Sequence, residues 1–307
     1  MAFKGTDKRT QQFLEAEVED KGAHLNAYTS REMTVYYAKC FSKDLPWAVE
    51  LLSDIIKNSK LDQRQEVESN YQEVVFDYLH ATAYQGTPLG RTILGPAENV
   101  RSLTPNDLRS FIKSNYKAPR MVLTAAGGVN HSQLRDLGEE YFGDVSATNE
   151  PGGGTPDLSA CRFTGSEIRD RDDAMPLAHI AGVYFTSEKM ALNDAVSSFT
   201  KEWVRMCSQI KEHEVARAKN QLKTHLLLQL DGTTPICEEI GRQMLVYGRR
   251  VPIDEMLARI DAINAEKLRE VCSKYFFDRC PAVASIGPVE TLPDYNRIRD
   301  QTWWIRL

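Results

Sequence analysis

The sequence lacks long apolar runs, paired cysteines and an excess of basic residues. No stretch reaches the roughly eighteen consecutive apolar residues that a membrane-spanning helix needs, so none is predicted. Six cysteines are scattered through 307 residues without a C-x-x-C pair, which argues against a disulfide scaffold and favours free thiols in a reducing compartment. Lysine and arginine number 38 against 43 acidic residues. The resulting net charge of −5 argues against general nucleic-acid binding.

The N-terminus also lacks the features of a targeting segment. The run from Met1 to Thr6, MAFKGT, has neither the apolar core of a signal peptide nor the Arg- and Ser-rich amphipathic pattern of a transit peptide. We therefore expect either that the chain is not imported as it stands or that its true N-terminus is missing. The length is sufficient for two ordinary domains.

The histidines are not spaced as they are in zinc-peptidase motifs. A helix that binds zinc through two histidines carries them four residues apart, with a glutamate between them as the general base. The six histidines are His24, His80, His131, His179, His213 and His225. No two of them have that spacing, and neither H-x-x-E-H nor its reverse occurs. Ordinary solvated or packed histidines explain the pattern best, and a scattered three-ligand site is the alternative.

Amphipathic periodicity predicts helices through the first half of the chain. Apolar residues recur at three- and four-residue spacing in 44–58 and 66–84, with Asp44 as the expected cap of the first helix. A threonine–proline start at Thr104 predicts a third helix, and a fourth follows at 132–142.

Short apolar segments predict strands between these helices. Residues 23–28 and 34–41 flank a polar turn and form a candidate antiparallel pair, while 121–126 is a short apolar strand that ends at two glycines. A glycine- and proline-rich stretch at 146–160 predicts a linker. Beyond it, we expect helices at 199–206, 212–230, 235–247 and 265–275, and a strand at 282–286.

Two acidic residues share one face of the second predicted helix. Glu73 and Asp77 are four residues apart, a spacing at which like charges repel by a few tenths of a kcal/mol. A guanidinium bound across both would offset this repulsion through charge-assisted hydrogen bonds. From spacing alone, a solvated acidic face is the simpler interpretation.

Long runs of sequence resemble one peptidase family. They include the first six residues, GAHLNAYTSRE (22–32), QEVVFDYLHATAY (72–84), RTILGP (91–96), AAGGV (125–129), FTGSEIR (163–169), EVAR (214–217), LDGTTPICEEIGR (230–242) and PDYNRIR (293–299). In these runs the chain resembles the M16 metallopeptidases. Within that family it is similar to the β-subunits of mitochondrial processing peptidases and to the related core protein 1 of the cytochrome bc1 complex.

The resemblance implies an α+β fold of two related M16-type domains, each an antiparallel sheet flanked by helices. We expect an N-terminal domain at 1–145, the linker at 146–160 and a C-terminal domain at 161–307. Both domains are expected to be incomplete. The family's zinc helix would precede Met1, a segment with the third zinc ligand would precede Glu66, and a long segment would lie between Ala181 and Gly182.

The resemblance also implies a function. The family is zinc-dependent, and this type of β-subunit removes presequences from imported proteins, but we expect no catalytic residue, no metal ligand and no zinc in this chain. Glu73 and Asp77 would bind an arginine of the substrate, and Asn26 and Ala27 would pair with extended substrate. Expected partners are a processing-peptidase α-subunit or core protein 2, cationic presequence peptides and the bc1 complex. The expected location is the mitochondrial matrix or the matrix face of the inner membrane. A non-catalytic core-protein role is the alternative.

Overall fold

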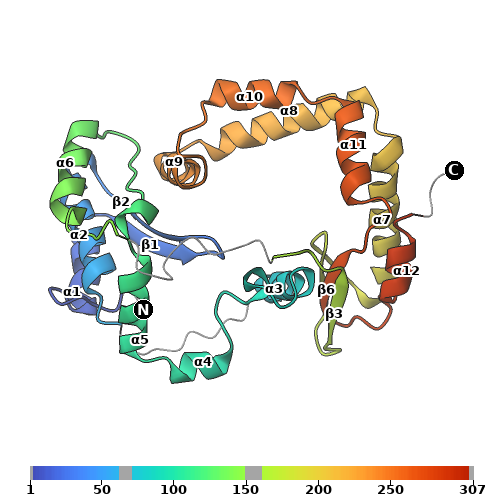
Figure 1. The fold of residues 1–307 in the computed structure, drawn as a ribbon, viewed down its shortest axis with the longest axis horizontal. Coiled ribbons are helices and arrows are strands. Elements are labelled where there is room, and N and C mark those ends of the chain that lie inside the picture. Colours follow the sequence, from blue (N-terminus) through green and yellow to red (C-terminus); the bar gives the residue numbers. More distant parts are fainter. Residues whose placement is uncertain (1–2, 62–70, 149–160, 304–307) are drawn as a thin grey trace. The chain divides into compact units, whose positions relative to one another are not determined.

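The computed structural model describes residues 3–61, 71–148 and 161–303 (Figure 1). Helices and strands alternate without a single regular repeat, which confirms the predicted α+β class. The chain divides into two compact units, each assembled from three segments. Unit 1 comprises Met1–Glu66, Pro96–Pro156 and His225–Ile253, and unit 2 comprises Val67–Gly95, Asp157–Thr224 and Asp254–Leu307. The linear division into domains at 1–145 and 161–307 stays a prediction, and most of the expected linker lies outside the described residues.

Unit 1 combines a β-hairpin with helices from three parts of the chain. Its elements are α1 (Gln11–Asp20), β1 (His24–Thr29), β2 (Thr34–Lys39), η1 (Ser42–Asp44), α2 (Leu45–Asn58), α4 (Ala97–Ser102), α5 (Pro105–Asn115), η3 (Ala118–Arg120), α6 (His131–Phe142) and α9 (Thr233–Tyr247). The predicted hairpin is confirmed, since β1 and β2 pair antiparallel from His24 opposite Lys39 to Thr29 opposite Thr34.

Helix α2 is the most deeply buried element of unit 1. Leu51 and Ile55 pack with Leu14 of α1, while Leu45 and Val49 pack with Leu137 of α6. Burial of each such side chain contributes roughly 1.5–3 kcal/mol. The apolar periodicity that predicted this helix therefore reflects packing against two helices, α1 on one side of α2 and α6 on the neighbouring side.

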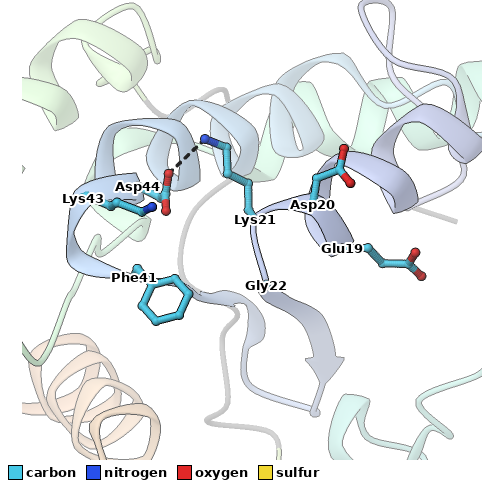
Figure 2. Close-up of a pocket in the computed structure, with 7 residues that line it drawn as sticks. All are labelled: Glu19, Asp20, Lys21, Gly22, Phe41, Lys43 and Asp44. Atoms are coloured by element: carbon cyan, nitrogen blue, oxygen red, sulfur yellow. Dashed lines mark hydrogen bonds and ion pairs between the residues drawn. The ribbon is translucent and has the colours of Figure 1, made fainter.

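Two details of unit 1 differ from the sequence-based expectations. Asp44 precedes α2, but its side chain forms no cap hydrogen bond; instead, Lys21 Nζ donates to Asp44 Oδ1 at 2.9 Å (Figure 2). Residues 121–126 do not form a strand, because they find no ladder partner among the described residues. At α5, in contrast, Thr104 forms the predicted cap as part of a reciprocal capping box with Asp107.

Unit 2 is built on a four-stranded sheet. Its elements are α3 (Tyr71–Ala83), η2 (Pro88–Gly90), β3 (Ser166–Arg171), β4 (Ala178–Ala181), β5 (Phe185–Ser187), η4 (Lys189–Ala191), α7 (Leu192–Ser208), most of α8 (Glu212–Gln229) and of α10 (Ile253–Asp261), α11 (Ala265–Tyr275), β6 (Ala282–Gly287) and α12 (Tyr295–Asp300). The strand order is β3-β6-β4-β5, and β3 runs parallel to β6 while the other pairs are antiparallel. The sheet is therefore mixed, whereas the resemblance implied a purely antiparallel one. Strands β3 and β6 can run parallel because a long connection that includes several helices brings the chain back to the same end of the sheet.

The join between Ala181 and Gly182 forms the turn of a hairpin. Strands β4 and β5 pair antiparallel up to Ile180 opposite Phe185, which leaves four residues in the turn. Gly182 has φ +152°, a conformation that a residue with a Cβ rarely adopts. The sheet thus continues across the point where the resemblance implied a missing segment.

Helix α3 covers one face of this sheet. Val75 is fully buried and packs with Ala284 and Ile286 of β6. Phe76 stacks on Tyr184 of the β4–β5 turn with ring centroids 5.5 Å apart. The opposite face carries a second cluster in which Val283 of β6 packs with residues of α7. Unit 2 is therefore a layered core with helices on both faces of the sheet.

We expect Val75→Ala to destabilise unit 2 by about 2 kcal/mol, because it removes two buried methyl groups and leaves a cavity. Denaturant unfolding can be followed by the fluorescence of Trp203, which stacks on Phe276 at 5.5 Å. The other tryptophans should be replaced by phenylalanine. A Val74→Ala variant, at a partly buried neighbour, is the matched control and should cost less. Equal midpoints for Val75→Ala and the parent would show that α3 is not part of this core.

In unit 1, a single guanidinium binds three carboxylates from two helices. Arg9 contacts Glu17 of α1 at 2.7 Å, and Glu50 and Asp54 of α2 at 2.6 and 2.9 Å. The Asp54 side chain is 1% exposed and also accepts a hydrogen bond from Thr6 at 2.6 Å. Burial alone would raise the pKa of all three carboxyl groups, but hydrogen bonds from Arg9 and neighbouring groups outweigh it, so each pKa lies below its ordinary value.

We expect Arg9→Met to lower the unfolding free energy of unit 1 at pH 7 by about 3–5 kcal/mol, because it leaves the buried Asp54 carboxylate and two partly buried carboxylates without their shared cation. Lys8→Met is the control, since Lys8 pairs with Glu50 from a position 62% exposed and its loss should cost less than about 1 kcal/mol. Urea unfolding followed by Trp47 fluorescence measures both.

The same variant should change the pH dependence. Carboxyl groups with depressed native pKa values contribute full stability above their unfolded values, about 3.9 for Asp and 4.3 for Glu, and lose it as the pH falls through the lower native values. Without Arg9, each pKa should rise, because burial is then opposed only by the remaining hydrogen bonds, from Trp47 to Glu17, from Lys8 to Glu50, and from Thr6 and Asn58 to Asp54. Lowering the pH should then destabilise the variant less than the parent. The difference between Arg9→Met and the parent should therefore shrink from pH 7 to pH 3.5. A constant difference would contradict the role of these carboxylates.

Candidate substrate-binding residues and the fit to zinc

The acidic pair predicted to bind substrate lies on α3, on the side away from the sheet. At about 100° per residue, Glu73 and Asp77 fall almost opposite Val75, which is buried against the sheet. Glu73 is exposed, and Asp77 is half-buried. The two carboxylates are therefore held at one turn's spacing by the burial of the opposite helix face.

A hydrogen bond that the sequence did not predict holds Asp77. The hydroxyl of Thr92 donates to Asp77 Oδ2 at 2.6 Å. Thr92 belongs to the RTILGP run that carried part of the resemblance. Membership of that run was the only sequence feature that could have pointed to Thr92 as a residue near the acidic pair. The residue that follows Asp77, Tyr78, lies toward the sheet and donates to Asp170 of β3 at 3.1 Å. Helix α3 is thus tied to two later segments of unit 2, through Asp77 on its acidic side and through Tyr78 on its sheet side.

The second predicted pair, Asn26 and Ala27, lies on β1 in unit 1. Asn26 is exposed, and it stands opposite Tyr37 in the hairpin register. Its Oδ1 atom accepts a hydrogen bond from the N–H of Ala27 at 2.8 Å. An extended peptide that pairs through this N–H would have to displace the Asn26 amide. Asn26 and Ala27 belong to one compact unit, and Glu73 and Asp77 belong to the other.

The side chains of the described ranges do not fit a zinc ion. A catalytic zinc site needs three protein ligands at about 2.0–2.3 Å and an open position for water. Within 3–61, 71–148 and 161–303, no three His, Cys, Asp or Glu side chains converge in this way. The histidines have other contacts: His179 Nδ1 lies 3.1 Å from the Tyr184 hydroxyl, and His80 Nδ1 lies 2.8 Å from the carbonyl oxygen of Phe76. We therefore assign no reaction step to a metal.

Comparisons with known proteins give the family. The family model of insulinase-type peptidases, Peptidase family M16, matches residues 1–97. The model of the Peptidase M16 inactive domain matches residues 102–189. The chain belongs to the M16 peptidase family.

Relatives cover the whole of this M16 chain. The human mitochondrial-processing peptidase subunit beta is 49% identical over 385 residues, which covers 100% of this chain and 78% of that protein. The mouse cytochrome b-c1 complex subunit 1 is 44% identical over 386 residues, which covers 100% of this chain and 80% of that protein. Since this chain has 307 residues, both alignments include segments that it lacks.

A solved structure has the same fold. A chain of "Complex III2 from Candida albicans, Inz-5 bound" matches with a TM-score of 0.80 at 24% identity, covering 92% of this chain and 86% of that one. The predicted M16 resemblance and the α+β fold with two M16 domains are thereby confirmed. The family is zinc-dependent, and the relatives are mitochondrial subunits. In the described part of this chain, every helix is too short or too polar to span a bilayer.

The acidic side of α3 generates a binding prediction. An arginine-bearing peptide should bind more weakly to Glu73→Gln and to Asp77→Asn, since each removes a charge-assisted hydrogen bond. Glu73 is exposed, so its loss should fall within about 0.2–1 kcal/mol, and the half-buried Asp77 should lose more.

A double-mutant cycle with Arg→Ala in the peptide tests these contacts, measured by calorimetric titration. Glu98→Gln, at an exposed position of α4, is the matched control and should leave the affinity unchanged. Strict additivity of the acid and arginine changes would mean that Glu73 and Asp77 are only a solvated face.

Proposed function

We propose that this chain is a β-type M16 subunit that binds basic peptides without hydrolysing them through zinc. The observation that carries the proposal is the lack of any three converging metal ligands in the described ranges, together with histidines that are never four residues apart in the sequence. A metallopeptidase that lacks its metal ligands has no means to activate the attacking water.

The substrate class follows from the charge on α3. Its acidic side carries two carboxylates at one turn's spacing, which suits a guanidinium better than a neutral or acidic side chain. A basic presequence supplies such groups, and the 49% identity to a processing-peptidase subunit supports this choice. Peptide binding through α3 requires no metal, so it can persist in a chain that does not cleave.

The partners we propose follow from the relatives' description as subunits. Proteins described as subunit beta and as subunit 1 of a complex act in assemblies. We therefore propose a processing-peptidase α-subunit or core protein 2 as the partner. The proposed location is the mitochondrial matrix or the matrix face of the inner membrane.

A structural role in a respiratory complex is the second candidate. It is favoured by the 44% identity to the mouse cytochrome b-c1 complex subunit 1, only slightly below the processing-peptidase value. Co-purification with a complex that contains cytochrome b would favour this role, whereas recovery with an α-subunit alone would favour the peptide-binding role.

We expect the dialysed protein to hold substoichiometric zinc and to leave a basic presequence peptide uncleaved while still binding it. Elemental analysis, mass spectrometry of the peptide and calorimetry measure the three properties. The human subunit beta, prepared with its partner, is the control for the peptide and the assay. One tightly held zinc per chain accompanied by turnover would contradict the proposal.

A further inference from the structure

Helices α7 and α11 of unit 2 pack against each other in opposite directions. Near the middle of α7, Trp203 stacks on Phe276, the C-cap residue of α11, with ring centroids 5.5 Å apart. Further along α7, the carbonyl oxygen of Cys207 accepts a hydrogen bond from the Ser273 hydroxyl at 3.0 Å. The residue number thus rises along α7 as it falls along α11, so the two helices are antiparallel.

This antiparallel packing places two cysteines opposite each other. Cys207 comes four residues after Trp203, and Cys272 comes four residues before Phe276, so each lies one helical turn from the stacked rings. Both cysteines belong to one apolar cluster, in which Cys272 is 7% exposed and Cys207 packs against the buried residues. A hydrogen bond beyond this level, from Arg269 of α11 to the carbonyl oxygen of Ile210 at 2.7 Å, continues the same progression.

The spacing of packed helices suits a disulfide between these positions. A disulfide needs Cα atoms about 4.4–6.8 Å apart. Packed helix axes lie about 8–10 Å apart and each Cα lies about 2.3 Å from its axis, so facing Cα atoms are about 3.4–5.4 Å apart. The two ranges overlap. Burial raises the pKa of Cys207, and the Cys272 thiolate raises this pKa further, an effect that only a nearby charge has.

We propose that Cys207 and Cys272 form a redox modification site, at which a small disulfide such as glutathione disulfide converts the two thiols into one disulfide that joins α7 to α11. The Cys207 thiolate attacks a sulfur of the small disulfide and forms a mixed disulfide. The thiolate released takes up the proton that Cys207 lost. The Cys272 thiolate then attacks Cys207 Sγ and expels the second small thiol. Two protein thiols are oxidised, and one small disulfide is reduced to two thiols.

Exposure decides which cysteine reacts first. Cys207 is half-buried, whereas Cys272 is buried, so the small disulfide reaches Cys207 and Cys272 completes the exchange. The Cys207 thiol now donates to the carbonyl oxygen of Trp203 at 3.1 Å, and this weak bond costs little to break. Because burial raises the pKa of both thiols, few thiolates exist at neutral pH and the reaction is slow.

The disulfide would act on the stability of unit 2. It would hold α11 on α7 and close the chain between the two helices into a loop, which restricts the unfolded state. In a reducing compartment the pair stays as thiols, and only an oxidised glutathione pool converts it. The proposal depends neither on peptide binding nor on zinc, so it stands apart from the proposed function.

Disulfide mapping of the full chain tests the proposal. The protein is incubated with glutathione disulfide at about pH 8, where more of each thiol is ionised than at neutral pH, and the remaining thiols are then alkylated. Mass spectrometry should show the loss of two hydrogen atoms and one cross-linked pair of peptides, carrying Cys207 and Cys272. Dithiothreitol should reverse both changes. In urea, the yield of this cross-link should fall about fivefold, because any of the five other cysteines can then reach Cys207.

Three variants separate the roles of the cysteines. Cys272→Ala should stop at a lasting glutathione adduct on Cys207, and Cys207→Ala should leave the buried Cys272 unmodified. Cys280→Ala is the control, since Cys280 is exposed and lies outside both helices, and it should keep the cross-link. Circular dichroism checks that each variant folds. Where a variant does not fold, the mapping of the parent chain decides.

Three outcomes would overturn the proposal. They are a lasting glutathione adduct on Cys207 of the parent without a cross-link, a cross-link of equal yield in buffer and in urea, and a disulfide that joins two chains. The second result would mean that the bond forms from the unfolded chain and not from the packed helices.

Discussion

The guanidinium of Arg9 joins α1 to α2 in unit 1. It bonds to carboxylates of both helices that would otherwise repel one another in a partly buried environment. Thr6 joins the same cluster through Asp54, so the N-terminal segment is fixed by the interaction that joins the two helices. Such an arrangement sets geometry more than it adds net stability, because desolvation of four charges consumes much of their mutual attraction. The β1–β2 hairpin and α6 pack against the two helices that Arg9 joins.

Local pattern was sufficient for most helices and for one hairpin. The stripe through Leu51 and Ile55 predicted α2, and Thr104 predicted the start of α5, because both signals depend only on neighbours in sequence. The strand at 121–126 failed because a strand also needs a partner, which no local pattern supplies. Asp44 failed as a cap because a distant lysine competed for its carboxylate. The β4–β5 hairpin was missed because its turn lies where the resemblance suggested an interruption.

The candidate site was predictable to a similar degree. The i, i+4 spacing of Glu73 and Asp77 placed both on one helix face, and the apolar stripe opposite them was visible in the sequence. That this stripe packs on β6, about two hundred residues later, was not visible, since tertiary contacts at such separation leave no periodic signal. Nor was the bond from Thr92, which fixes the orientation of Asp77. Residue types and spacing thus predicted two neighbouring carboxylates, whereas the contacts that hold them in place came only from the structure.

The short turn between β4 and β5 shows how a chain of this kind can change length. The turn begins and ends at two residues that face each other in neighbouring strands, Ile180 and Phe185. Gly182 has the positive φ that the turn contains. Whatever is added there leaves and rejoins the sheet at one point, so the entropic cost of a longer loop grows only slowly with its size. This position is therefore a natural place to graft a fluorescent reporter or an affinity module without disturbing the strand order. Evolution can use the same property to gain or lose whole segments of the second unit.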